Sequence, residues 1–311
     1  MGLTRRSPIL LKKESSYGVD PSPVAGTDGI LVENPEVTLE NIVVSDRNGV
    51  RQTLATLQKV VGDTLYGIKF AVELKGSGSA GTAPEIGPAL ECCGMGETIV
   101  GGTSVAYAPS SDEANHESCT IYAYQDGELY KLLGCRGSVE CVMTADKVAM
   151  LNFTFVGHRD GTVSDTAVIT PTLSIVVPPV MKAGTLTLNS VSHVVPEVKW
   201  GLNNNLSIRG DISAVDGFAP IRIVGRDVTL GISPEAVAAA THNHIAQMLA
   251  NASEAFATGA IGAAGNQVQV ACPAAAYRGI SIGDREGVRI KDLELGCAES
   301  SGDDELTITF T

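Results

Sequence analysis

Residues 119–133, which read CTIYAYQ-DG-ELYKLL, indicate the fold class of this chain of 311 residues. The runs Cys119–Gln125 and Glu128–Leu133 lie on either side of the pair Asp126–Gly127. Asp-Gly suits a type I′ turn, which needs positive φ at both central residues. The stretch therefore predicts two antiparallel strands joined by a tight hairpin.

The strand signal extends along the chain in both directions from this hairpin. In Tyr66–Lys75 the side chains of Ile68, Phe70, Val72 and Leu74 alternate with more polar or smaller ones, which is the period of a half-buried strand. Further strands are expected at 103–109, 137–143, 151–156, 185–189, 206–209, 221–224, 228–230, 268–271, 279–282, 288–295 and 306–310. Gly and Pro separate these short runs, which favours a sandwich or barrel over βαβ units.

Two segments have helical signals. Residues 88–93 (PALECC) place Pro in the first turn and Gly94 after the end. A longer helix is expected from about Ser233 to Ala252, because Ser233 is a good N-cap and Pro234 a good first residue. The fold class is therefore all-β with a minor helical part.

The two halves of the chain follow a similar order of elements about 155 residues apart. Each has a strand (71–76 or 227–232), a helix, a strand (103–109 or 266–273), and later a closing strand that ends at Phe155 or Phe310. The sequence thus predicts two tandem sandwich or barrel domains, each with one helix. The expected parts are an extended N-terminal arm (1–30), a first domain (31–168), a Pro-rich linker (169–184) and a second domain (185–311).

Composition limits the classes of function. The formal net charge is −13, so binding of nucleic acid by phosphate neutralisation is not expected, although an acidic wall would let DNA slide past. No apolar run reaches the ~20 residues of a membrane span, and the apolar stretch Ile9–Leu11 is too short for a signal peptide. The seven cysteines have no Cys-x-x-Cys spacing and are expected to be buried, reduced side chains.

No motif predicts a catalytic, cofactor-binding or metal site. His242 and His244 are expected on one helix at i and i+2, where they would point to different faces and not converge on a metal. The Gly-rich segment 76–82 lacks the Lys of a phosphate-binding loop, and Arg209–Gly210–Asp211 is expected to form a turn. The chain is therefore expected not to be an enzyme.

The first half resembles the tail tube (major tail) proteins of long-tailed bacteriophages. The opening KKESSYGVDPSPVAGTDGILVENPEVT resembles that of the family, with its expected residues at Glu14, Tyr17, Gly18, Asp20, Pro21 and Pro23. The run FAVELKGSGSAGTAPEIGPALECCGMGETIVGGTSVAYAPSS (70–111) and the hairpin region that follows are also similar. The resemblance covers about residues 10–158, and the second half lacks the Gly-Ser-Gly loop.

This resemblance implies a structural virion protein that forms stacked rings around the path of double-stranded DNA, assembled in the host cytoplasm. Its partners would be copies of itself, three per ring if duplicated and six otherwise, and tail proteins such as the tape measure, terminator and baseplate. The arm 1–30 and the loop 76–82 are expected to contact neighbouring copies. The alternatives are a terminator or baseplate ring and a carbohydrate-binding or adhesin module, which the single Trp200 disfavours.

Overall fold

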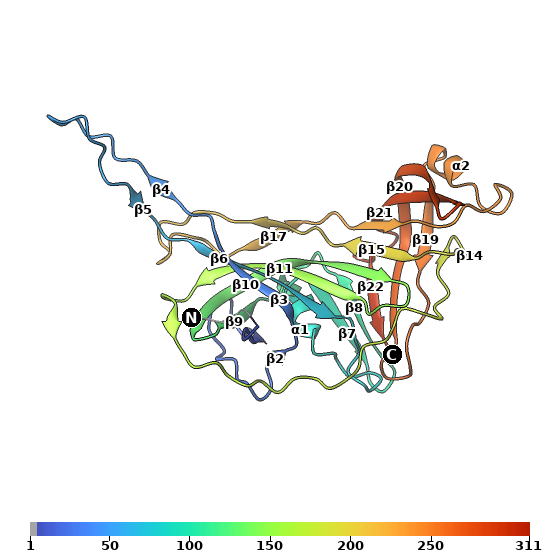
Figure 1. Cartoon of the computed structure of the whole chain (residues 1–311), viewed down its shortest axis with the longest axis horizontal. Helices are drawn as coiled ribbons and strands as arrows, with labels where there is room; N and C mark the ends of the chain where they lie inside the picture. The colour runs from blue at the N-terminus through green and yellow to red at the C-terminus, as the bar shows by residue number, and fades with distance from the viewer. Residues whose placement is uncertain (1–4) are drawn as a thin grey trace.

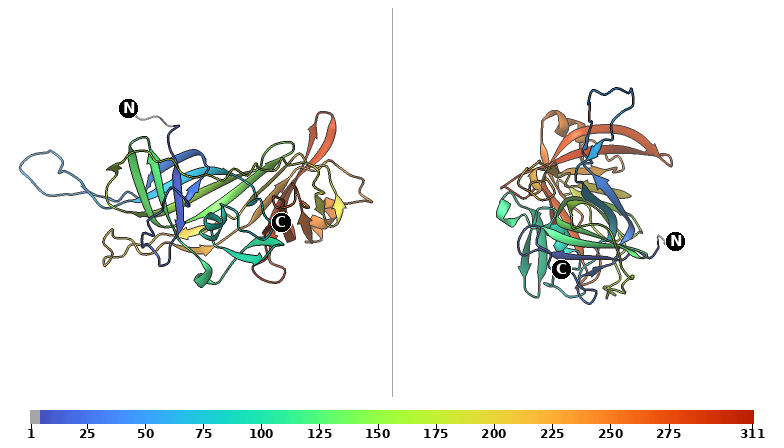
Figure 2. Two further views of the ribbon diagram at one scale, coloured as in Figure 1. Left: turned by 90° about the horizontal axis from the view of Figure 1, so that it is seen from below. Right: turned by 90° about the vertical axis from the view of Figure 1, so that its left-hand side faces the viewer.

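The computed structural model describes residues 5–311 and shows an elongated molecule built almost entirely of β-strands (Figures 1 and 2). A curled sheet forms the body, and the long strands β20 (Val268–Arg285) and β21 (Val288–Ala298) stand at one end. A thin hairpin of β4 (Val44–Ser45) and β5 (Val60–Val61) projects from the other end. The expected all-β fold with a minor helical part is confirmed.

The other elements fall into two groups separated by residues 166–186. The first group is β1 (Ile9–Lys13), β2 (Gly29–Ile30), β3 (Glu33–Glu40), β6 (Leu65–Glu73), α1 (Gly87–Glu91), β7 (Met95–Val100), β8 (Ser104–Pro109), a 3₁₀ turn (Glu113–Asn115), β9 (Cys119–Gln125), β10 (Glu128–Thr144), β11 (Met150–Arg159) and β12 (Ser164–Asp165). The second group is β13 (Thr187–Leu188), β14 (Val191–Ser192), β15 (Glu197–Gly201), β16 (Asn205–Ser207), β17 (Arg222–Gly225), β18 (Thr229–Ile232), α2 (His244–Leu249), β19 (Ser253–Ala257) and β22 (Thr307–Phe310).

Strand pairing is the same in both groups. In the first, β1 pairs with β2 and β9, β10 pairs with β9, β11 and β12, and β6 pairs with β11 and β3. In the second, β13 pairs with β14 and β19, β20 pairs with β19, β21 and β22, and β18 pairs with β21 and β15. A separate hairpin follows the equivalent strand in each group: β4–β5 follows β3 in the first, and β16–β17 follows β15 in the second. The chain therefore contains the same topology twice.

This repeat corrects the element matching expected from the sequence. The sequence matches the strand at 266–273 with the one at 103–109. In the structure this segment is the start of β20, whose partners are the equivalents of those of β10. The strand of residues 151–155 lies in β11 and corresponds to β21, whereas the C-terminal strand β22 corresponds to β12. The first group also contains the additional hairpin β7–β8, which shifts the spacing between equivalent strands.

The two groups are joined by hydrogen bonds. Strand β10 pairs with β15, and β22 pairs with β8, so both groups belong to one connected sheet. One hydrophobic core runs through both and includes Ile9, Phe153, Trp200, Leu295 and Phe310. The division into two domains with the boundaries given above stays a prediction.

The hairpin that opened the sequence analysis forms as expected. Strand β9 spans Cys119–Gln125, and Asp126 and Gly127 have φ of 35° and 116°. The segments expected as separate strands at 128–133 and 137–143 are a single strand, β10, because an irregularity in register between Leu133 and Arg136 lets pairing continue. All seven cysteines are buried and free, as expected.

Two expectations are corrected. Residues 9–13 and 29–30 of the expected extended arm lie in the sheet, because Ile9, Leu10 and Leu11 are buried against β9; residues 1–4 lie outside the described part. The long helix expected from Ser233 to Ala252 is only α2, His244–Leu249, and Asn243 caps it by accepting from the backbone N–H of Ala246. The short helix expected at 88–93 is present as α1.

No helix among residues 5–311 has both the length and the apolar character needed to cross a membrane.

Candidate assembly surfaces

Two unpaired strand edges, those of β3 and β20, are related by the repeated topology. Strand β3 pairs only with β6, and the part of β20 from Tyr277 to Arg285 pairs only with β21 among the described residues. In the repeated topology, β3 corresponds to β15, and this part of β20 corresponds to the C-terminal part of β10. Strands β10 and β15, the equivalents of the two free edges, are hydrogen-bonded to each other inside the chain.

That internal junction is a regular antiparallel ladder. Glu140–Thr144 of β10 pairs with Glu197–Gly201 of β15, with Cys141 opposite Trp200. The side-chain amide of Asn204 strengthens it by donating to the carbonyl oxygens of Cys93 (2.6 Å) and Gly137 (2.9 Å). The junction therefore combines backbone pairing with side-chain bonds that span the two groups.

The junction makes one wide sheet, in the order β3-β6-β11-β10-β15-β18-β21-β20. One face packs on the core through side chains such as Phe70, Phe153, Cys141 and Leu295. The other face has a row of directly paired residues: Glu73, Met150, Val142, Lys199, Gly231, Glu294 and Gly279. Strand alternation thus gives this sheet a second, polar face.

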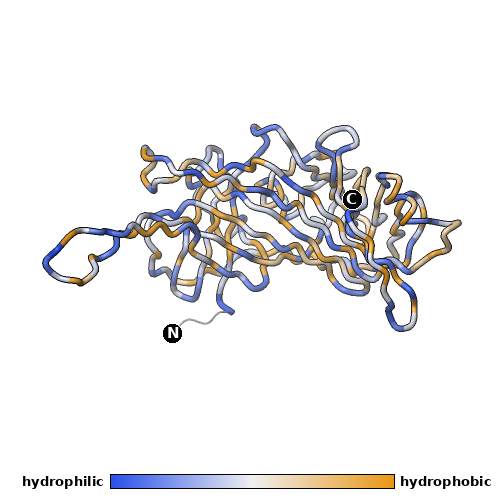
Figure 3. Tube along the Cα trace, turned by 90° about the horizontal axis from the view of Figure 1, so that it is seen from above, coloured by the Kyte–Doolittle hydropathy of each residue, from blue (hydrophilic) through white to orange (hydrophobic). Residues whose placement is uncertain are grey.

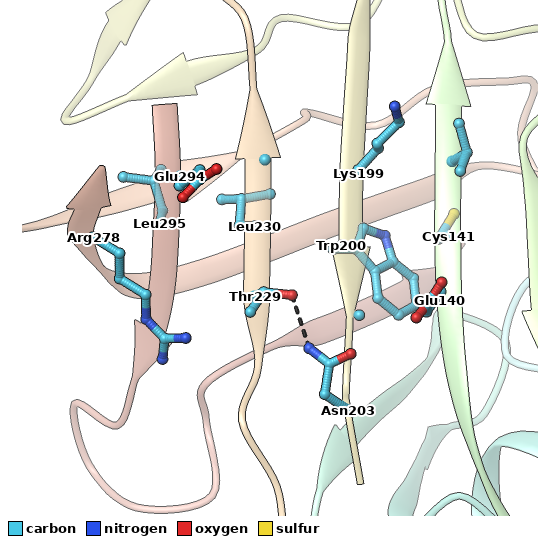
Figure 4. Close-up of a pocket in the computed structure, with 13 residues that line it drawn as sticks. Glu140, Cys141, Lys199, Trp200, Asn203, Thr229, Leu230, Arg278, Glu294 and Leu295 are labelled. Carbon is cyan, nitrogen blue, oxygen red and sulfur yellow. Dashed lines mark hydrogen bonds between the residues drawn. The ribbon is translucent and has the colours of Figure 1, made fainter. Parts of the chain in front are cut away.

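The polar face is hollowed where small residues meet. A groove of about 420 Å³ lies over Gly201, Thr229 and Gly231, with Glu140 on one side and Glu294 and Arg278 on the other (Figure 4). Asn203 donates to the hydroxyl of Thr229 at 2.9 Å within it. Gly and Thr project little from the sheet, which leaves the space between the longer side chains on either side.

Acidic side chains exceed basic ones on this face. The carboxylates are Glu33, Glu36, Glu40, Glu73, Glu140, Glu197, Asp292 and Glu294, and the basic groups are Lys69, Lys199, Arg278 and Arg285. Lys199 forms an ion pair with Glu197 at 2.7 Å, and Arg278 with Asp227, so these two cations are already neutralised. The face therefore presents negative charge to whatever lies above it.

The β4–β5 hairpin is a projecting arm that carries exposed aliphatic side chains among polar ones. Val50 and Leu54 near its tip are fully exposed, at 104% and 107% of their reference areas, and the tube in Figure 3 shows apolar stretches along it. An ion pair between Lys59 and Asp46 (2.8 Å) holds the two sides of the arm together. Exposed aliphatic groups at the end of a long hairpin are typical of a binding surface.

The equivalent arm in the second group, β16–β17, is docked on the first group. Figure 1 shows β17 running along the body in the direction in which β4–β5 projects. Arg136 donates to the carbonyl oxygens of Ile221 (2.9 Å) and His116. The side-chain amide of Asn204 donates to Cys93 O, and the backbone N–H of Ile221 donates to the hydroxyl of Tyr17. The β16–β17 arm therefore has its binding surface within the chain, whereas the equivalent β4–β5 arm does not.

The residues that carry the family resemblance build this docking surface. The carboxylate of Glu14 is 5% exposed and accepts from Gly18 N, Gly134 N, Ser118 Oγ and Thr120 Oγ1, each at 2.7 Å. This fixes the loop that presents Tyr17, whose hydroxyl accepts from the backbone N–H of Ile221. Burial is the largest influence on the Tyr17 phenol and raises its pKa, so it stays protonated at neutral pH.

His158 and Asp216 add a second contact between the docked arm and the body. His158 Nδ1 lies 2.5 Å from Asp216, and its Nε2 lies 3.0 Å from the hydroxyl of Tyr17. Burial acts to raise the pKa of Asp216, but hydrogen bonds from His158 and from the backbone of Phe218 outweigh it and lower the pKa. Asp216 therefore keeps its charge at neutral pH.

The structure places the other motifs as follows. The segment 76–82 is not free, because Gly78 N donates to Gly265 O (3.0 Å) and Gly76 N to Asn266 Oδ1 (2.7 Å). Arg209–Gly210–Asp211 lies in the distal part of the β16–β17 arm, with Gly210 bridged to Phe218.

The expectation that His242 and His244 point apart is wrong. His242 precedes α2 and His244 begins it, so they do not share a helix, and their rings stack with centroids 4.1 Å apart. His193 joins them from the turn after β14, and one nitrogen from each of the three rings lies within 4.8 Å of the others. The sequence offered no signal for His193, because it is remote from the pair.

Comparison with known proteins identifies one family. The model of a family described as phage tail tube protein matches residues 4–311. The match includes the second group of strands, to which the resemblance noted in the sequence did not extend. No curated protein matches the chain. Because the family model covers nearly its whole length, the chain belongs to the phage tail tube protein family.

Proposed function

We propose that three copies of this chain close into a ring with pseudo-sixfold symmetry, and that these rings stack head to tail into the tube through which phage DNA leaves the virion. The observation that supports this most is the β10–β15 junction between two groups of equal topology. An interface between equivalent units inside a chain is a template for the interface between chains.

The free edges complete the same pattern between subunits. In a ring, the edge of β20 in one copy would pair with β3 of the next, as β10 pairs with β15 within each copy. An unpaired edge readily accepts another strand. Two groups per chain and three chains give six equivalent junctions, which removes every open edge of the wide sheet.

The free arm fits the same arrangement. If β3 pairs with β20 of a neighbour, the β4–β5 arm that follows β3 points toward the second group of that neighbour. It would lie there as β16–β17 lies on the first group within the chain. Burial of Val50 and Leu54 would then add a hydrophobic contribution to the subunit contact.

The wide sheet would line the bore of the tube with its polar face. Glu73, Glu140 and Glu294 would then point into the lumen and repel the phosphates of the duplex. In the groove over Gly201 and Gly231, the side chains of Asn203 and Arg278 are already bonded to Thr229 and Asp227 of the same chain. DNA would pass without specific binding, and no catalytic step is involved.

The proposal places the protein in the virion tail after assembly in the host cytoplasm, with the tape measure, terminator and baseplate proteins as further partners. Head-to-tail stacking of rings does not close and so produces a filament. A terminator or baseplate protein would instead form a single closed ring. Negative-stain electron microscopy of the purified protein separates these: long hollow tubes support the proposal, and single rings or monomers contradict it.

Strand pairing at the proposed ring contact is tested with two adjacent proline substitutions, Ser281→Pro and Ile282→Pro. Neighbouring backbone N–H groups of β20 point to opposite sides, one toward β21 and one toward the free edge. The substitution that removes the N–H bonded to β21 should lower the stability of the subunit. The substitution that removes the N–H at the free edge should leave the subunit folded but unable to form rings. Ring formation by both folded variants would exclude pairing at this edge.

A further inference from the structure

Three buried histidines meet beneath helix α2 in the second group of strands. His193, His242 and His244 are 7%, 4% and 0% exposed, and their ring centroids lie 4.1–5.3 Å apart. They come from the turn after β14, from the loop before α2 and from the first residue of α2. Three imidazoles at this spacing are close enough to bind one metal ion.

The hydrogen bonds around the cluster fix which ring nitrogens have free lone pairs. Tyr277 donates its hydroxyl proton to Glu254 Oε2 (2.5 Å), so its oxygen accepts from His244 Nδ1 (2.9 Å). His242 Nε2 lies 2.9 Å from Glu254 Oε1 and donates to this carboxylate. His244 Nε2 and His242 Nδ1 are therefore left without protons, as metal ligands must be.

The third imidazole completes the set. His193 Nε2 lies 3.1 Å from His242 Nδ1, close to the separation of about 3.3 Å between two nitrogens bound to a tetrahedral zinc ion at about 2.05 Å each. His244 Nε2 is buried and has no partner among the described residues, and neither has His193 Nδ1. An unpartnered buried nitrogen is costly, and a metal would remove this cost at His244.

Polar side chains behind the cluster hold the rings in place. Glu254, 2% exposed, accepts from His242 and from Tyr277, which in turn binds His244. Carboxylate and phenol groups behind ligand histidines orient the rings and raise their basicity.

We propose that His193 Nε2, His242 Nδ1 and His244 Nε2 bind a structural zinc ion, with Glu254 and Tyr277 as the outer groups that position the histidines and a water as fourth ligand. Binding moves the remaining proton of His193 to Nδ1. Three imidazoles favour Zn²⁺ over Mg²⁺ or Ca²⁺, which prefer oxygen ligands.

The site would hold a segment that has little other regular structure. Residues 233–252 contain only the six-residue α2, and Leu249 is 74% exposed. A zinc ion would tie this segment to β14 through His193 and, through Glu254 and Tyr277, to β19 and β20. This inference does not depend on ring formation.

The test uses the untagged full-length protein, stripped with a chelator and reloaded with Zn²⁺ or Co²⁺. After gel filtration we expect one Zn²⁺ per chain by mass spectrometry and the intense visible absorption of tetrahedral Co²⁺. His242→Gln and His244→Gln should abolish both signals, and Glu254→Gln should weaken Zn²⁺ affinity about 10–100-fold. His158→Gln, which lies outside the cluster, should bind as the wild type does.

Failure of the wild-type chain to retain stoichiometric Zn²⁺ would overturn the proposal whatever the variants do. Equal Zn²⁺ retention by folded His242→Gln would overturn it as well. If the histidine variants fail to fold, Glu254→Gln and Tyr277→Phe provide the test, because both variants keep the three histidine ligands. Unchanged Zn²⁺ affinity in both would contradict the positioning role of Glu254 and Tyr277 and the proposed geometry.

Discussion

The phenolic oxygen of Tyr17 accepts a hydrogen bond of 2.7 Å from the backbone N–H of Ile221, 204 residues further along the chain. Arg136 stacks over the Tyr17 ring, 5.3 Å from its centroid, and also binds the carbonyl of Ile221. Ile221 has no exposed surface, and both its backbone N–H and its carbonyl oxygen are hydrogen-bonded to residues of the first half of the chain. The N-terminal motif therefore holds the arm of the second half.

Tyr17→Phe should loosen the docked arm without unfolding the sheet. The substitution leaves the N–H of Ile221 buried without an acceptor, which should lower the free energy of unfolding by about 1–3 kcal/mol. Urea denaturation measures this, and hydrogen exchange should show faster exchange of the Ile221 amide. Tyr130→Phe removes a hydroxyl bonded only to exposed Glu128 and serves as the control. Equal stability of the two variants would contradict the importance of this contact.

Glu14→Gln should destabilise the protein more than a typical polar substitution. All four neighbours of the carboxylate are donors, so the amide NH₂ of glutamine would face N–H and O–H groups in a buried place. We expect a loss of about 2–4 kcal/mol in the free energy of unfolding. Glu128→Gln, at an exposed position, should change it by less than about 0.5 kcal/mol. A Glu14→Gln variant as stable as this control would show that the carboxylate charge is dispensable.

Local signals in the sequence predicted the strands well where turn chemistry was clear. The Asp126–Gly127 pair and the alternation around Phe70 located β9, the start of β10, and β6 to within one or two residues. Strand β15 was missed because Glu197–Gly201 is short and follows Pro196, and its pairing partner β10 is more than 50 residues away. Long-range pairing of this kind leaves no periodic pattern in one strand alone.

The helix expected at 233–252 failed for an identifiable reason. Residues 235–236 instead bond to β21, with Ala236 N donating to Arg289 O, and residues 238–242 form a turn in which Thr241 N and His242 N donate to Ala238 O. The burial of His242 and His244 then decides where α2 begins. A helical wheel drawn on the sequence separates these two rings, whereas tertiary packing brings them together.

The β4–β5 arm should be needed for assembly and not for folding. Val50→Asp combined with Leu54→Asp changes only side chains that are fully exposed in the subunit, so the thermal midpoint should stay unchanged. Tubes should nevertheless fail to form, because two charges would be buried at the proposed contact. Ile175→Asp, at another exposed aliphatic residue outside both arms, is the control. Normal tubes from the double variant would show that the arm tip lies outside the subunit contacts.

The negative charge of the wide sheet should keep DNA from adhering to the tube. Glu140→Lys combined with Glu294→Lys reverses two charges beside the groove of Figure 4 and changes the net charge by about +4 per chain. Tubes of this variant should retain short fluorescent duplexes in pelleting assays at low salt and release them as salt rises, whereas wild-type tubes should retain none. Glu128→Lys combined with Glu299→Lys makes the same change away from this face and should behave like the wild type. Because repulsion acts only on charges that the duplex approaches, equal retention by both variants would mean that this sheet does not face the bore.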